Sequence, residues 1–132
     1  MSVVDRRSRR RGETVQEILD VALEVMAEEG VAALSLSEVA RRMGLRPPSI
    51  YQYFASRMAI YDALFEWGAR QELEVAERYG DRIAADPVAG IAAAQEAVLG
   101  WVQANPVLAQ LLHWRPVPGF EPSARAFEPA VR

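Results

Sequence analysis

A regular series of helix start and stop signals constrains the fold of this chain more than any other feature. Residues 14–17 and 35–38 both match a capping box. In this motif the hydroxyl of the first residue accepts a hydrogen bond from the third backbone N–H of the helix, and the glutamate at that third position accepts one from the N–H of the first residue. Gly30 and Gly44 follow as left-handed helix ends, and apolar side chains recur between these signals at spacings of three and four. The pattern predicts a long helix before Gly30 and a short one before Gly44.

Signals of the same kind predict the remaining helices. Ser56 caps a helix that Gly80 stops, and Asp86 and Asn105 each precede a proline at the first helical position. Irregular structure is expected from Pro116 onward, where prolines are frequent. No strand pattern competes, so the predicted fold class is all-α, with about six helices. The further predicted helices are Pro47–Tyr53, Arg57–Tyr79, Pro87–Ala104 and Pro106–His113.

Two short helices joined by a tight turn at Gly44-Leu45 form the helix-turn-helix plan over residues 35–54. Such a motif places its second helix in the major groove of duplex DNA, with that helix's N-terminal residues at base edges. Here Arg46 can donate a bidentate pair to guanine, and Ser49 can bond several bases. Pro47, between them, offers apolar contact, as does the proline after it.

The charge distribution fits DNA better than the formal net charge of −3 does. Residues 1–12 hold five arginines and one aspartate, whereas residues 13–30 hold six acids and no base. Residues 38–57 hold four arginines and one glutamate. Two basic segments therefore flank an acidic helix, a distribution that favours a nucleic-acid partner.

Composition excludes several other classes of protein. The chain of 132 residues contains no cysteine, which excludes disulfides, Cys-based zinc sites and thiol nucleophiles. Its apolar stretches fall far short of the roughly 18 residues of a membrane span, so we expect a cytoplasmic protein without a membrane partner. No metal motif, phosphate loop or catalytic constellation is visible, and His113 is assigned a structural or solvated role. We expect no metal, no cofactor, no catalytic residue and no enzymatic activity.

Residues 13–70 resemble the DNA-binding domain of the TetR family of bacterial repressors. The resemblance implies a three-helix helix-turn-helix DNA-binding domain followed by a partial helical regulatory domain, because family members are usually much longer. We divide the chain into a basic N-terminal arm (1–11), a TetR-type domain (12–72) and a partial ligand-binding and dimerisation domain (73–132). The residues in register are Ile18-Leu19-Asp20-Val21-Ala22, Glu29-Gly30, Glu38-Val39-Ala40, Gly44-Leu45, Ser49-Ile50-Tyr51-Gln52-Tyr53-Phe54 and Ser56-Arg57.

The resemblance also implies which residues contact DNA. Tyr51 would meet phosphate through its hydroxyl, and Gln52 or Tyr53 would reach a base or a phosphate. Arg57 matches a family lysine that meets phosphate from the start of a helix, where the dipole also favours an anion. The predicted DNA-binding set, with the two serines that open the first short helix as phosphate contacts, is Ser35, Ser37, Arg46, Pro47, Ser49, Tyr51, Gln52, Tyr53 and Arg57.

Plainer roles stay open for several of these residues. The rings of Tyr51 and Tyr53 can simply pack over the hydrophobic core while their hydroxyls hydrogen-bond to water. Arg41 and Arg42 lie on the exposed side of their helix and suit either solvent or DNA. The arginines of residues 6–11 form either a solubilising tail or an arm that enters a flanking minor groove.

The second half resembles the regulatory domain of one TetR subgroup, from Asn105-Pro106 to Leu111-Leu112 and from Arg115 to Pro122. This resemblance implies a small apolar effector enclosed in that half and a homodimer that binds a palindromic operator. Ordinary helical core is the alternative for the five apolar residues that could line the pocket. They are Trp67, Trp101, Leu108, Leu111 and Trp114.

The function that follows is a sequence-specific DNA-binding transcriptional regulator, a repressor that its effector releases through a shift between two states. The alternative is a truncated helical interaction module that pairs with a full-length relative and modulates that relative's DNA binding.

Overall fold

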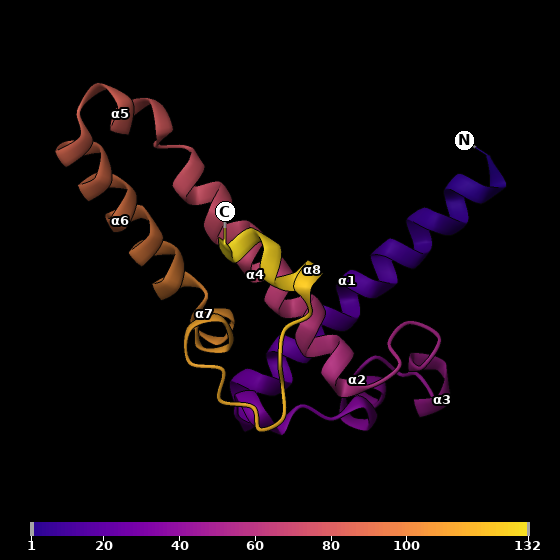
Figure 1. Cartoon of the computed structure of the whole chain (residues 1–132). Helices are drawn as coiled ribbons and strands as arrows, with labels where there is room; N and C mark the ends of the chain where they lie inside the picture. The colour runs from indigo at the N-terminus through magenta and orange to yellow at the C-terminus, as the bar shows by residue number, and fades with distance from the viewer. Residues whose placement is uncertain (1, 132) are drawn as a thin grey trace. The chain divides into compact units, whose positions relative to one another are not determined.

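The computed structural model describes residues 2–131, and all regular structure in this range is helical, which confirms the all-α prediction (Figure 1). The chain packs as two compact units, Met1–Tyr61 and Asp62–Arg132, and the division falls within one helix. The elements are α1 (Val3–Glu29), the 3₁₀ turn η1 (Val31–Ala33), α2 (Leu36–Arg42), α3 (Pro47–Ile50), α4 (Arg57–Glu77), α5 (Gly80–Ala85), α6 (Pro87–Ala104), α7 (Pro106–His113), α8 (Ala124–Phe127) and the 3₁₀ turn η2 (Glu128–Val131).

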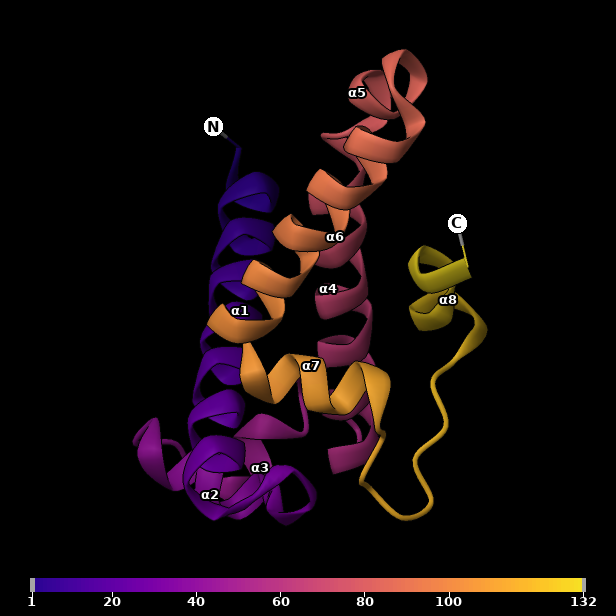
Figure 2. The same cartoon turned by 90° about the vertical axis from the view of Figure 1, so that its left-hand side faces the viewer.

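Helix α1 begins at Val3, so the start predicted at residue 14 is wrong. The Ser2 Oγ accepts from the Asp5 N–H at 3.1 Å, and the Asp5 carboxylate accepts from the Ser2 N–H at 3.4 Å. These two bonds form a capping box ahead of the arginines, whose helix propensity is high. The box expected at residues 14–17 therefore lies inside a continuous helix, which Figure 2 shows as a single rod.

The first unit is built on the apolar stripe of α1. The stripe packs with α2 and η1, and Ile50 of α3 is fully buried beside them. Buried Tyr61, near the start of α4, donates its hydroxyl to the Val31 carbonyl at 2.5 Å and accepts from the Leu34 N–H at 3.3 Å. These bonds fix the segment that leads into α2. The buried residues of the stripe are Ile18, Leu19, Ala22, Val25 and Met26.

The turn between α2 and α3 has the predicted chemistry. Gly44 has a φ of 69°, a left-handed conformation that favours glycine, and Pro47 occupies the first turn of α3. Helix α3 ends at Ile50 rather than near Tyr53, because the backbone there tightens into 3₁₀-type bonds. The Tyr53 N–H donates to the Ile50 carbonyl at 3.0 Å.

The second unit contains the rest of α4, with α6 antiparallel to it and α5 joining them at one end (Figure 1). Gly80, expected to stop a helix, instead opens α5 after α4 has ended at Glu77. Helices α5 and α6 approach each other very closely at Gly90. A Cβ added there would lie 2.5 Å from the backbone N and Cα of Ile83, so the approach requires glycine.

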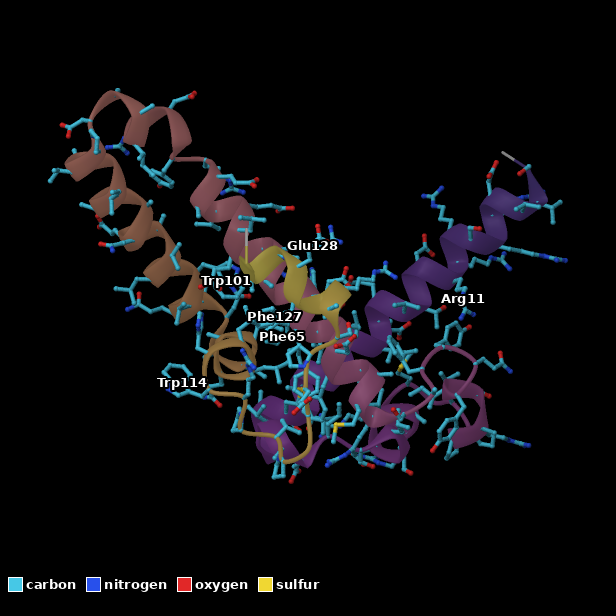
Figure 3. The ribbon with its side chains drawn as sticks, viewed as in Figure 1. Arg11, Phe65, Trp101, Trp114, Phe127 and Glu128 are labelled. Atoms are coloured by element: carbon cyan, nitrogen blue, oxygen red, sulfur yellow. The ribbon has the colours of Figure 1, made fainter. Side chains whose placement is uncertain are left out.

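Irregular structure is expected from Pro116 onward, but this part of the chain contains the two short helical elements α8 and η2. Ser123 caps α8 by accepting from the Ala126 N–H at 3.1 Å. The Asp62 carboxylate on α4 accepts from both the N–H and the Oγ of Ser123, each at 2.7 Å. Phe127 stacks on Phe65 with ring centroids 5.9 Å apart. Figure 3 labels the two residues next to each other. These contacts to α4 stabilise a segment whose proline content alone predicts loop.

Candidate nucleic-acid interface

The N-terminal end of α3 presents the residues predicted to face DNA bases. Arg46 is the N-cap residue of α3, its side chain is exposed, and it makes no capping bond to the helix. Pro47 is exposed at the first helical position, and Ser49, two residues further along, is half-buried. Because Ile50 is fully buried, this short helix has one face fixed against the core. The backbone of Arg46 is therefore held at a defined place, and its side chain extends into solvent.

A cleft of about 380 Å³ lies beside this helix and gathers four of the nine predicted residues. Ser35 and Ser37 come from the start of α2, Tyr51 from the end of α3, and Arg57 from the first turn of α4. The side chain of Tyr51 is 56% exposed, so its hydroxyl is accessible. With Ser56, four hydroxyls and a guanidinium surround one cleft and form a set of donors suited to phosphate oxygens. The remaining lining residues are Leu34, Leu36 and Ala55.

Arg57 also holds the cleft in shape. Its Nη1 donates to the carbonyls of Ala32 and Leu34, at 3.1 and 3.4 Å, and its guanidinium lies 5.9 Å from the centroid of the Tyr61 ring. A guanidinium carries five N–H donors, so this bonding leaves capacity for an anion. Arg57 thus supports the segment ahead of Ser35, and its predicted role toward phosphate stays a prediction.

Arg41 and Arg42 are engaged by carboxylates rather than turned freely to solvent. Glu38 accepts from Arg41 at 2.6 Å and from Arg42 at 2.9 Å, and Glu28 accepts from Arg42 at 2.5 Å. The hydrogen bonds from the two arginines lower the pKa of Glu38 to about 2. The bonds from Glu28 and Glu38 raise the pKa of Arg42 above its ordinary value. The Ser35 Oγ accepts a hydrogen bond from the Glu38 N–H at 3.4 Å, as predicted. The Glu38 carboxylate bonds the two arginines and does not accept from the Ser35 N–H, so the second bond of the capping box is not formed.

Arg11 contacts the segment that follows α3, and no local sequence pattern predicts these contacts. Its Nη2 donates to the Gln52 carbonyl at 2.9 Å, and its guanidinium lies 4.9 Å from the centroid of the half-buried Tyr53 ring. Figure 3 shows Arg11 pointing from α1 toward the turn after α3. The contact joins residues 41 positions apart, a separation that no local pattern can reveal. Gln52 keeps an exposed side chain, as a base or phosphate contact requires.

The structure gives residues 6–11 a helical conformation, and their role as a solubilising tail or as an arm stays a prediction. Residues 3–11 are continuous with the rest of α1. A helix with its side chains is about 10–12 Å wide, whereas the minor groove is about 6 Å wide. This segment is too wide to enter a minor groove of ordinary width.

The five residues predicted for the effector pocket are dispersed in the second unit. Leu108 and Leu111 are buried, and Trp101 donates its ring N–H to the Gln71 Oε1 at 3.1 Å. Trp67 is half-buried, and Trp114 is 70% exposed and points away from the helices in Figure 3. None of these five side chains lines the apolar groove described next, and their place in an effector pocket stays a prediction.

A different set of residues lines an apolar groove of about 450 Å³ in this unit. At the side of the groove, the His113 Nε2 lies 3.0 Å from the Glu72 Oε1, so His113 has a carboxylate partner that lies far away in the sequence. Two apolar residues of α6 at this groove are notably exposed, Ile91 at 46% and Leu99 at 55%. The lining residues are Glu72, Ala76, Ile83, Ile91, Ala94, Gln95, Val98, Leu99, Val102 and His113.

Two further findings concern residues 2–131. This part of the chain contains no cluster of three or more His, Asp or Glu side chains arranged to hold a metal ion. Its helices also include none with the length and apolar character needed to cross a membrane.

Comparison with known proteins agrees with this helix-turn-helix. Residues 18–64 match the family described as bacterial regulatory proteins, tetR family. The HTH-type transcriptional regulator Rv1816 of Mycobacterium tuberculosis is 29% identical over 118 residues, which cover 89% of this chain and 50% of that protein. The HTH-type transcriptional regulator AcrR of Shigella flexneri is 32% identical over 76 residues, 58% of this chain and 35% of that protein. The chain thus spans about half the length of the mycobacterial relative it matches.

The fold comparison extends over nearly the whole chain. The crystal structure of the protein SCO4313 superimposes with a TM-score of 0.78 and 30% sequence identity, covering 93% of this chain and 58% of that one. The helix-turn-helix at residues 35–54 and the family match together show that residues 18–64 form a domain of the tetR family of bacterial regulatory proteins, and the shared fold extends this similarity over most of the chain.

Proposed function

We propose that this chain is a sequence-specific DNA-binding transcriptional regulator that acts as a repressor. The observation that carries the proposal is the cleft that gathers Ser35, Ser37, Tyr51 and Arg57 beside the exposed end of α3. Hydroxyl and guanidinium donors around a cleft suit the phosphates of duplex DNA, and the adjacent helix end suits the major groove. A regulator of this kind works in the cytoplasm, where a bacterial chromosome lies.

The proposal divides affinity and specificity between two sets of residues. The residues of the cleft bind phosphates and fix the register of the protein on the duplex, while Arg46 reads guanine and Ser49 a neighbouring base. Gln52 and Tyr53, just beyond α3, add a base or phosphate contact. Pro47 supplies apolar contact, which suits a thymine methyl group.

In vitro selection from a random duplex library, followed by anisotropy titration of the selected sequence, tests this division. We expect Arg46→Ala to relax preference at one base position and to cost about 1–3 kcal/mol of binding free energy. Arg57→Ala should weaken all sequences alike and reduce the salt slope by about one unit. If both variants change every sequence equally, the division is wrong, and absence of salt-dependent binding by the wild type at low ionic strength refutes the proposed function.

A homodimer on a palindromic operator completes this proposal. A two-fold dimer binds half-sites about one helical turn apart, roughly 34–36 Å, and gains affinity by linking two contacts. Selected sequences should then contain inverted repeats with this spacing. Sedimentation of the protein mixed with the selected duplex should give two chains per duplex, and a stoichiometry of one would contradict the dimer.

Release by a small apolar effector is supported by the groove of the second unit. Its volume of about 450 Å³ lies within the usual range of ligand sites, and its walls are mainly aliphatic with the Glu72–His113 pair as polar anchors. An effector that prefers one of two states of the regulator would shift the population away from the DNA-binding state.

The fluorescent apolar probe 1-anilinonaphthalene-8-sulfonate can test this groove. We expect Ile91→Glu, which puts a charge on the groove wall, to abolish most of the probe's fluorescence gain. Val88→Glu is the matched control, because Val88 lies on the same helix, is 83% exposed and does not line the groove. Equal effects of the two substitutions would contradict an effector site at this position.

The exposure of Ile91 and Leu99 also favours a second candidate function, a helical interaction module that pairs with a full-length relative and modulates its DNA binding. Sedimentation without DNA separates the candidates. A monomer at high protein concentration that also fails to associate with a full-length relative counts against the module, whereas a mixed complex that lowers the relative's DNA affinity supports it.

A further inference from the structure

The N-terminal part of α1 is a basic helix that projects beyond the core of the first unit. All residues from 3 to 11 are exposed, and five of them are arginines. At 1.5 Å per residue, this segment adds roughly 13 Å of helix. Figures 1 and 2 both show it extending past α2 and α3. Because the segment buries no side chain, core packing does not explain why it is helical.

Arg11 ties this helical extension to the recognition element. Its guanidinium bonds the Gln52 carbonyl and lies over the Tyr53 ring, both directly after α3. The extension therefore starts beside the surface that the proposed function turns toward DNA. Both contacts lie within the first compact unit.

The spacing of the arginines in the extension places four of them in two adjacent rows along the helix. Arg7 and Arg11 are four residues apart and form one row, and Arg6 and Arg10 form a second row next to it. Arg9 lies about 160° around the helix from Arg11 and about 60° from Arg6. There it pairs with Glu13 at 3.4 Å.

Among the described residues, Arg6, Arg7 and Arg10 make no ion pair with a carboxylate, whereas Arg9 forms a surface ion pair with Glu13. Like charges at positions i and i+4 destabilise an isolated helix by about 0.2–0.5 kcal/mol per pair. The two rows therefore oppose the helix in the free protein, and a polyanion placed along them would remove that cost. Duplex DNA carries a phosphate every ~3.4 Å along each strand, so a helix of this length passes several.

We propose that residues 3–11 are a second phosphate-binding element, in which Arg6, Arg7 and Arg10 contact the DNA backbone flanking the segment that α3 occupies. Arg11 tethers the element to the turn after α3. This inference rests on the proposed function and extends it, because the contacts lie outside the helix-turn-helix. The element acts as a helix along the backbone, not as an extended arm in the minor groove.

Anisotropy titration with a mixed-sequence duplex of 30 base pairs, between 50 and 300 mM KCl, tests the proposal with the full chain. Each phosphate contact contributes about 0.9 to the slope of log Kobs against log salt. The triple variant Arg6→Gln, Arg7→Gln, Arg10→Gln should therefore lower the slope by about 2–3 units and weaken binding at 100 mM by at least ~100-fold. Glutamine has nearly the helix propensity of arginine, and circular dichroism checks that the helix is kept.

Arg9→Gln is the matched control, since it removes one charge from the same helical segment on the face that pairs with Glu13. We expect its slope to equal that of the wild type. If the wild type binds and the triple variant keeps the wild-type slope, the proposed function stands and the second phosphate element is refuted. If the wild type itself does not bind the duplex at 50 mM, the proposed function fails first.

Shortening the duplex gives an independent arm of the test. On a duplex of about 14 base pairs without flanking DNA, the wild-type slope should fall toward that of the triple variant, while the triple variant should change little. A wild-type slope that does not depend on duplex length contradicts contacts to flanking phosphates.

Discussion

Tyr61→Phe removes a single oxygen from the point where the core of the first unit meets the proposed DNA-binding surface. The Tyr61 hydroxyl lies between the Val31 carbonyl, at 2.5 Å, and the Leu34 N–H, at 3.3 Å, and the residue is 0% exposed. The segment that it holds leads directly to Ser35, which caps α2 and lines the cleft beside α3. The substitution keeps the ring and therefore isolates the hydrogen bonds.

The expected loss follows from the two buried groups left without this partner. An unsatisfied buried donor or acceptor costs about 1–3 kcal/mol, so we expect the free energy of unfolding to fall by about 2–4 kcal/mol. For a domain of this size, the melting temperature should fall by roughly 10 °C. DNA affinity should fall as well, because Ser35 and Ser37 lose their fixed position in the cleft.

Urea unfolding followed by circular dichroism, with anisotropy for DNA binding, measures both effects. Tyr79→Phe is the control: Tyr79 is half-buried, its hydroxyl has no hydrogen bond among the described residues, and removing it should change stability by less than about 0.5 kcal/mol. If the Tyr61 and Tyr79 variants were equally stable, the hydroxyl would not fix the entry to α2 and the reasoning would be refuted.

Three further predictions concern other parts of the chain. Gly90→Ala forces a Cβ to within 2.5 Å of the Ile83 backbone, so the free energy of unfolding in urea should fall by at least about 2 kcal/mol. The control Gly100→Ala adds a Cβ with no atom within 4 Å, and the free energy of unfolding should rise by about 1 kcal/mol. The pKa of Glu38 is lowered to about 2, so its stabilising contribution is complete above pH 4.5 and lost as pH falls toward 2. Glu38→Gln should remove that part of the acid dependence of unfolding, and an unchanged profile would count against the arginine cluster. Ser123→Ala should expose the α8 segment to limited proteolysis, since it removes the Oγ bonds to Asp62 and to the helix end.

The motif between residues 35 and 57 could be predicted from the sequence because its signals are local. The serine cap of α2, the left-handed Gly44 and the proline opening of α3 all stand where the sequence indicates. Each is a backbone preference of one or two residues, and each is satisfied within a few positions of the chain. The all-α class follows from the same signals.

The starts and ends of other helices depend on competing caps and on long-range contacts, which local sequence signals do not resolve. Two capping boxes compete at the N-terminus, and the one at Ser2 prevails over the one at Thr14. Helix α8 exists because Asp62, far away in the sequence, binds Ser123. The predicted domain boundary at residue 72 and the packing division after Tyr61 both fall inside α4, where no break in the helical pattern marks either.

The candidate site in the second unit shows why composition alone was insufficient. Large apolar residues fit core and ligand pocket equally well, and here Leu108 and Leu111 became core while Trp114 faces solvent. The groove is lined instead by smaller aliphatic residues of α6, whose exposure depends on how α4 and α7 pack against it. Arg11 escaped prediction for a similar reason, since its contacts with residues 52 and 53 exist only in the folded unit.

Mapping of backbone amide chemical shifts during titration with duplex DNA tests the central claim most directly, because it locates the interface residue by residue. We predict that the largest shifts lie in residues 35–57, at Ser35, Ser37, Arg46 and Tyr51 among them, and that α6 of the second unit does not shift through direct contact. A titration in which residues 35–57 stay unperturbed, or in which the shifts concentrate on the apolar groove of α6, would contradict this prediction.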